Sequence, residues 1–78
     1  MYDNIINEAG EVTYLSEREV EVLRHLNTPA SGKVIATSLN ISIFTLNQHL
    51  RNIYRKLATN SRMGAVHAAR KNNFYHSI

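Results

Sequence analysis

The chain has 78 residues, a formal net charge of +3 and no cysteine. This length allows one domain with a small core. The lack of cysteine excludes disulfides and thiolate metal sites and fits a reducing cytoplasm. No apolar run approaches the roughly 20 residues that span a membrane. The first residues lack the basic and apolar regions of a signal peptide. The initial methionine and the untagged ends slightly favour a free-standing protein over a fragment of a larger one.

The charges are unevenly distributed along the chain. All six acidic residues lie at or before Glu21, whereas all nine basic residues except Arg18 follow Val22. A long cationic stretch without acids favours a polyanion partner, through contacts to phosphate and the release of counterions. The alternative is a basic face that is solvated and has no partner. Charge therefore favours, but does not by itself establish, a nucleic-acid partner.

Residues 1–14 show no clear periodicity, and we expect a loose N-terminal arm from which Ile5, Ile6 and Val12 can pack back. Beyond the arm, apolar residues recur at helical spacing and predict an all-α fold without strands. We expect a helical domain over 15–72 and a short C-terminal tail over 73–78. The predicted helices lie at about residues 16–27, 31–39, 43–57 and 62–72.

The first helix carries a clear start signal. Ser16 and Glu19 form the pattern of a capping box, in which each side chain bonds the backbone N–H of the other residue. Leu15 and Val20 stand where a hydrophobic staple needs them. The predicted buried stripe is Val20, Leu23 and Leu26, with Val22 at its edge. Pro29 ends the helix, because the residue before a proline avoids the α region.

The second helix follows Ser31 and turns Ile35, Ala36 and Leu39 inward. Asn40 suits the left-handed conformation that a tight turn demands. Ser42 is then the cap of the third helix. Only about three residues separate the second and third helices. A connection this short forces the two helices to cross steeply, which is the helix-turn-helix geometry.

The third helix has two contrasting sides. At 100° per residue, its apolar positions fall within about 80° of one another and predict a buried stripe. They are Ile43, Leu46, Leu50, Ile53 and Leu57. The opposite side carries Phe44, Gln48, Arg51 and Arg55, flanked by Asn47 and Asn52. Amides pair with adenine and guanidiniums with guanine in the major groove. A merely solvated face usually mixes Glu with Lys, and this one has no Glu.

The fourth helix is rich in small residues, including Ala65, Ala68 and Ala69. Small side chains let another helix approach closely. They favour either the remaining core of one subunit or a symmetric dimer contact.

Together these segments resemble the LuxR/FixJ-type (GerE-like) DNA-binding domain over about residues 15–71. The opening Leu15-Ser-Glu-Arg-Glu-Val-Glu-Val-Leu23 and Ser31-Gly-Lys-Val-Ile-Ala36 carry the resemblance. It continues in Leu39-Asn-Ile-Ser42, Thr45-Leu-Asn-Gln-His49, Asn52-Ile53, Lys56-Leu57, Arg62 and Ala65-Val66. The domain-4 segment of sigma factors is also similar, but the spacing within the third helix favours the LuxR/FixJ type.

The resemblance implies a bacterial transcription regulator whose third helix binds double-stranded DNA. It implies a homodimer through the fourth helix, RNA polymerase as a further candidate partner, and a cytoplasmic, nucleoid-associated location. The implied base-reading positions are Asn47, Gln48 and Arg51. The implied phosphate contacts are Lys33, Ser42, Thr45, Asn52, Arg55 and Lys56. The expected dimer contacts are Arg62, Met63, Ala65, Val66, Ala69 and Arg70.

The chain departs from the family pattern at several positions. Asn47 replaces the usual lysine, which weakens non-specific attraction to phosphate and shifts base preference. Val34 replaces the usual glutamate and removes the capping partner of Ser31, while Gly32 lowers helix propensity. Pro29 stands where glycine is common. These departures bear on the strength of DNA binding, and we expect the fold to tolerate them.

Functions other than DNA binding find less support in the sequence. The four histidines show no pair at metal-binding spacing, and no nucleophile–base set or glycine-rich phosphate loop occurs. We therefore expect no cofactor, no metal and no enzymatic activity. A second hypothesis is a protein-interaction module that keeps the fold and sequesters a related regulator without binding an operator. Gln48, Arg51 and Arg55 favour DNA binding, whereas Asn47 favours its loss.

Overall fold

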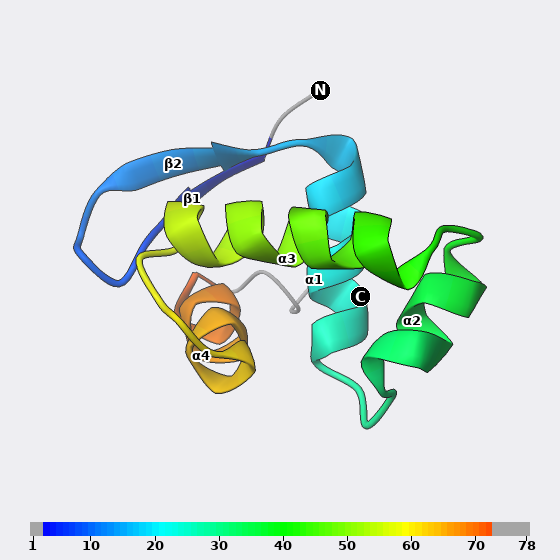
Figure 1. Ribbon diagram of the computed structural model, residues 1–78. Helices are drawn as coiled ribbons and strands as arrows, with labels where there is room; N and C mark the ends of the chain where they lie inside the picture. The colour runs from blue at the N-terminus through cyan, green and yellow to red at the C-terminus, as the bar shows by residue number, and fades with distance from the viewer. Residues whose placement is uncertain (1–2, 73–78) are drawn as a thin grey trace.

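The computed structural model describes residues 3–72 and consists of a β-hairpin followed by four helices. The elements are β1 (Asp3–Ile6), β2 (Val12–Leu15), α1 (Glu17–Leu26), α2 (Gly32–Ser38), α3 (Ile43–Lys56) and α4 (Arg62–Lys71). Figure 1 shows α3 lying across α1, with α2 beside its start and α4 beneath its end. The predicted helices agree with these bounds to within one residue at either end. The predicted tail, 73–78, lies outside the described residues.

A serine begins every helix. The hydroxyls of Ser16, Ser31, Ser42 and Ser61 each accept a hydrogen bond from the N–H three residues along the chain. Each hydroxyl thereby satisfies one of the donors that a helix start leaves free. The capping box predicted at Ser16 is confirmed, because the Ser16 N–H also donates to Oε1 of Glu19 at 2.8 Å.

Two helices end in left-handed residues. Asn40, at φ 59°, follows α2, and Ala58, at φ 56°, follows α3. At both ends, the N–H groups just past the helix donate back to carbonyls of its last turn, which is the Schellman pattern. The left-handed Asn40 confirms the sequence prediction. The sequence does not predict a left-handed conformation at Ala58, because the Cβ of alanine makes this conformation unfavourable by about 1 kcal/mol.

The prediction of a chain without strands is wrong, because β1 and β2 pair antiparallel, with Ile5 opposite Thr13. Ile5 and Leu15 face the core and are buried. Ile6 and Val12, expected to pack back, are instead 46% and 58% exposed on the outer face. This outer face is also apolar, so the alternation that reveals a half-buried strand is missing from the sequence. The fold is therefore mostly helical but not all-α.

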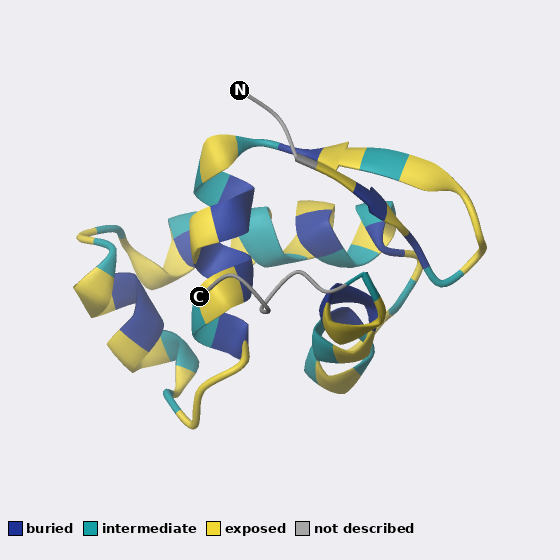
Figure 2. Cartoon of the chain, turned by 180° about the vertical axis from the view of Figure 1, so that it is seen from behind, coloured by how far each residue is buried: buried dark blue, intermediate teal, exposed yellow. Residues whose placement is uncertain are grey.

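The core forms where α1, α3 and α4 meet beneath the hairpin, and Figure 2 shows buried and exposed positions alternating along these elements. Val22, expected at the edge of the stripe, is fully buried. Ile43, expected inside, is 43% exposed because the first turn of α3 lies beyond the crossing with α1. Leu50 is half-buried. The buried apolar residues are Ile5, Leu15, Val20, Val22, Leu23, Leu26, Ile35, Ala36, Leu46, Ile53, Leu57, Ala65, Ala68 and Ala69.

Gly64 in α4 packs closely against Thr59, which lies in the segment between α3 and α4. A Cβ at this position would overlap the Thr59 hydroxyl and lie 2.8 Å from the Thr59 Cβ. We expect Gly64→Ala to lower the free energy of unfolding by about 1 to 3 kcal/mol, since the backbone must shift to relieve the overlap. Urea unfolding followed by circular dichroism measures this change.

Gly32→Ala is the matched control for Gly64→Ala. At Gly32 the nearest atom to an added Cβ is Leu46 Cδ2, at 3.8 Å, which is an ordinary contact. The control should be neutral or stabilising by up to about 1 kcal/mol. Equal stability of the Gly64→Ala variant and the wild type would contradict the close approach of Thr59.

Candidate nucleic-acid interface

The turn between α2 and α3 fixes the angle at which α3 is presented. Leu39 and Ile41 pack against the core on either side of the left-handed Asn40. The Ile41 N–H donates to the carbonyl of Ala36 at 2.9 Å, which closes the end of α2. Ser42 then caps α3 directly. Two helices joined by such a turn form a helix-turn-helix unit, as the sequence predicts.

The solvent side of α3 contains the predicted base-reading residues. Asn47, Gln48 and Arg51 are all exposed, as are Asn52 and Arg55. They lie opposite a stripe in which Leu46, Ile53 and Leu57 are fully buried. The structure therefore brings two amides and a guanidinium to one accessible side of one rigid helix. Such a face has the donors and acceptors that distinguish base pairs in the major groove.

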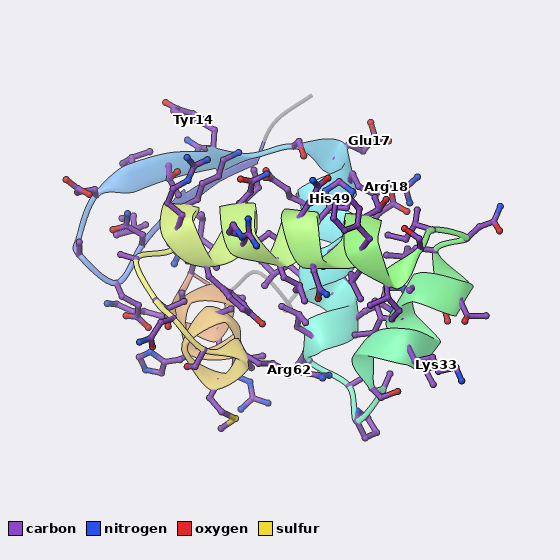
Figure 3. The ribbon with its side chains drawn as sticks, in the orientation of Figure 1. Tyr14, Glu17, Arg18, Lys33, His49 and Arg62 are labelled. Carbon is purple, nitrogen blue, oxygen red and sulfur yellow. The ribbon has the colours of Figure 1, made fainter. Side chains whose placement is uncertain are left out.

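The charged residues of α2 and α3 are all basic. Neither α2 nor α3 contains an acid. Among the side chains that the structure describes, none of the ion pairs involves Lys33, Arg51 or Arg55. Figure 3 shows Lys33 projecting outward from α2. Arg55 donates a hydrogen bond to Oδ1 of Asn52 at 3.3 Å, which orients it along the exposed side. These three cations remain available to a polyanion.

Two hydroxyls lie at the start of α3. The Ser42 hydroxyl donates to Oγ1 of Thr45 at 3.1 Å and accepts from the Thr45 N–H at 3.0 Å. Ser42 is exposed and Thr45 is half-buried. Both therefore lie at the positive end of the helix dipole, beside α2, where an anion is favoured.

Lys56 differs from the other predicted phosphate contacts. Its ammonium lies 2.7 Å from Oε1 of Glu19, so it is paired within the protein and joins the end of α3 to the start of α1. Burial of Glu19 raises the pKa of its carboxyl, but hydrogen bonds from Lys56 and Ser16 outweigh burial. The net result is a pKa lowered from its usual value. The pair thus holds α3 in place.

The residues expected at a dimer contact divide into two groups. Ala65 and Ala69 are fully buried within the chain, so they serve its own core. Arg62 donates to the carbonyls of Leu26 and Thr28, at 3.1 and 2.7 Å, and closes the end of α1. Figure 3 shows Arg62 between α4 and that end of α1.

The remaining expected dimer residues are accessible. Met63 is 79% exposed, Val66 is half-buried, and Arg70 is exposed and donates to Oδ1 of Asn27 at 3.0 Å. Met63 and Val66 line a shallow hollow together with Leu26. This side of α4 therefore presents a small apolar patch with Arg62 and Arg70 beside it.

Sequence reasoning missed the polar links between distant segments. The sequence predicts Glu19 as a capping residue but not its second partner, Lys56, which lies 37 positions further along the chain. The buried Asn7 of the hairpin, which bonds the end of α3, gave no signal at all. No local pattern predicts such pairs, because they depend on how the helices pack.

The described part of the chain lacks two further kinds of feature. No helix there is both long and apolar enough to cross a membrane. Within the same residues, no three or more His, Asp or Glu side chains gather where one metal ion could bind.

Comparison with known proteins agrees with this geometry. The family model of bacterial regulatory proteins of the luxR family matches residues 13–69. The chain belongs to this family. The matched range contains α1, α2, α3 and most of α4.

The curated relatives are longer proteins. The nitrate/nitrite response regulator protein NarP of Escherichia coli is 45% identical over 59 residues, which cover 76% of this chain and 27% of NarP. The CsgBAC operon transcriptional regulatory protein of the same species is 42% identical over 62 residues, which cover 80% of this chain and 29% of that protein. The luxR-family chain thus spans less than a third of the length of these relatives.

A solved structure shares the fold. The Vibrio cholerae VqmA dimer, described as a LuxR-type receptor in the absence of target DNA, superposes with a TM-score of 0.73. The sequences are 23% identical, and the match covers 95% of this chain and 35% of that one.

The Glu19–Lys56 pair makes stability depend on pH. Because the folded-state pKa of Glu19 is lowered, its stabilisation is present above the unfolded pKa and is lost as the pH falls through the folded value. Glu19→Gln keeps an acceptor for the capping box but removes the charge. We expect Glu19→Gln to lower the free energy of unfolding at pH 7 by about 1 to 3 kcal/mol. The variant should also lose less stability than the wild type as the pH falls below about 4.5.

Urea unfolding at a series of pH values measures both effects. Glu17→Gln, an exposed carboxylate in the same turn, is the control and should change both properties little. Parallel stability curves for the Glu19→Gln variant and the wild type would contradict the role of the pair.

Proposed function

We propose that this chain binds double-stranded DNA in a sequence-specific manner, with α3 in the major groove, and thereby regulates transcription. The observation that carries the proposal is the exposed, acid-free side of α3, which presents amides and guanidiniums on a helix anchored by its other side. Family membership and relatives named as response and transcriptional regulators support it. A sequestering module without DNA binding is not favoured, because it would not need this face.

The residues of the face have distinct proposed roles. Asn47, Gln48 and Arg51 lie where they would reach base edges, with the amides suited to adenine and Arg51 to guanine. Lys33, Ser42, Thr45, Asn52 and Arg55 would hold phosphates and so set the register of α3 on the duplex. Lys56 would contribute less than these residues, because its charge is paired with Glu19. Access to the chromosome implies a cytoplasmic, nucleoid-associated location, and RNA polymerase is a further proposed partner.

The electrostatic part of the proposal predicts binding that depends steeply on salt. With about two to three phosphates neutralised per protomer, the logarithm of affinity should fall with the logarithm of salt at a slope of about −2 to −3 per protomer. Fluorescence anisotropy of a labelled duplex between low and moderate salt measures it. Affinity that does not change with salt would contradict a phosphate-bound face.

Arg51 and Lys33 should differ in what they contribute. We expect Arg51→Ala to weaken binding to a preferred site by about 1 to 3 kcal/mol while leaving scrambled DNA nearly unaffected, because it removes a base contact. Lys33→Ala should weaken both DNAs alike and reduce the salt slope by about one. Competition binding with a preferred and a scrambled duplex separates the two effects. Identical behaviour of the two variants would rule out this division of roles.

We also propose that the chain forms a homodimer through the exposed patch of Met63, Val66 and Arg70 on α4. A two-fold contact uses the same patch on both copies, and an apolar patch is suited to it. Met63→Glu, at a position 79% exposed, should shift sedimentation towards the monomer without unfolding the chain. Val12→Glu, at an exposed apolar position on the hairpin, is the control. Identical sedimentation of both variants and the wild type would argue against this interface.

A further inference from the structure

The carbonyls at the end of α3 accept hydrogen bonds from two separate parts of the chain. A helix leaves its last four carbonyls without partners inside the helix. Three carbonyls near the end of α3, those of Ile53, Tyr54 and Arg55, accept from the N–H groups of residues 57–59, at 2.9 to 3.2 Å. The next two carbonyls, of Lys56 and Leu57, therefore need donors from outside this turn.

Both donors come from the turn of the N-terminal hairpin. Nδ2 of Asn7 donates to the carbonyl of Lys56 at 3.0 Å. The backbone N–H of Glu8 donates to the carbonyl of Leu57, also at 3.0 Å. Figure 1 shows this turn descending to the end of α3. Two adjacent residues of the hairpin thus complete the cap of the proposed DNA-reading helix.

The side chain of Asn7 is held rigidly in this role. Only 5% of Asn7 is exposed. The side-chain Oδ1 of Asn7 accepts from the backbone N–H groups of Ala9 and Glu11, both at 2.9 Å. The backbone N–H of Asn7 donates to the carbonyl of Glu11 at 2.8 Å. Donor and acceptor ends are therefore both satisfied. Aspartate would keep the acceptor but lose the donor that reaches α3.

The same hairpin is also tied to α4. Oε1 of Glu8 lies 2.6 Å from Nδ1 of His67, and Oε2 lies 3.7 Å from Nζ of Lys71. The hydrogen bond with His67 lowers the pKa of Glu8; burial opposes this effect, and Lys71 adds to it. The amide of Asn72 accepts from the N–H of Ile6 at 2.9 Å and donates to its carbonyl at 2.8 Å. The turn therefore joins α3 to a hairpin that α4 holds in place.

We propose that Asn7 is a positioning residue for DNA recognition, which fixes the C-terminal end of α3 through the hairpin turn. The inference rests on the proposed DNA-binding function. Asn7 precedes the family match, which begins at residue 13, so this clamp is supplied by a segment outside the matched range. Arg55 directly precedes Lys56 in α3, and Arg51 lies about one turn earlier.

Loss of the clamp should affect specific and non-specific binding differently. Base contacts require side chains placed to within about 0.5 Å, which a mobile helix end does not provide. Attraction to phosphate acts over about 10 Å at moderate salt and tolerates such motion. Asn7 should therefore control the preference for a specific site more than the overall affinity for DNA.

Asn7→Asp tests this proposal, with Asn4→Asp as the matched control. Both variants make the same chemical change, but Asn4 is exposed on the outer face of β1. We expect Asn7→Asp to weaken binding to a preferred duplex by about fivefold or more relative to the control, roughly the effect of one buried hydrogen bond. Binding to scrambled DNA should change by less than about twofold, since phosphate contacts dominate there.

Amide hydrogen exchange provides a readout that needs no DNA. The Glu8 N–H is protected by the carbonyl of Leu57 and should exchange faster in the Asn7→Asp variant. The N–H groups of Ala9 and Glu11 should keep their protection, because the introduced carboxylate would still accept from them. If Asn7→Asp does not fold at the working temperature, Asn7→Ser replaces it, since the shorter side chain cannot reach α3.

The outcomes separate the inference from the proposed function. Equal loss on preferred and scrambled duplexes, or unchanged exchange at Glu8, would overturn the role of Asn7 while leaving DNA binding intact. A wild type that prefers no sequence would instead overturn the proposed function, and the recognition role of Asn7 with it. A selective loss together with faster exchange at Glu8 would support both.

Discussion

The burial of one side of α3 is the constraint on which the rest of the structure depends. Leu46, Ile53 and Leu57 are fully buried, and each contributes about 1.5 to 3 kcal/mol relative to exposure. In a chain of this size such terms are a large part of the total stability. Because the buried side is fixed, the opposite side, with Gln48 and Arg51, must face outward. The same contacts that fold the chain thus present its proposed binding face.

Apolar packing sets which side of α3 is buried, and polar contacts hold its ends. At the start, Ser42 caps the helix directly after the left-handed Asn40. At the end, Lys56 pairs with Glu19 of α1, while Asn7 takes up the carbonyl of Lys56. The two contacts at this end are partly buried, where a hydrogen bond is costly to lose. A helix anchored at both ends can offer its exposed side without reshaping on contact.

The sequence predicts the helical part of the fold well because its signals are local. Capping serines, the left-handed Asn40 and the 3.6-residue periodicity each operate within one or two turns. The hairpin was missed because its outer face is as apolar as its inner face. The surface of the candidate site follows from the same periodicity, which places Asn47, Gln48 and Arg51 outside. The polar anchors at Asn7, Lys56 and Arg62 could not be predicted, because their partners lie 34 to 49 positions away.

We propose that the outer side of α3 reads the base sequence of duplex DNA. In-vitro selection from a random duplex library, at a salt concentration where scrambled DNA binds weakly, tests it most directly. Base reading by a dimer on one face of the duplex should enrich a single motif made of two symmetric half-sites, with centres about 10 base pairs apart. A library that is retained but shows no enriched motif, or retention of no DNA at all, would contradict it.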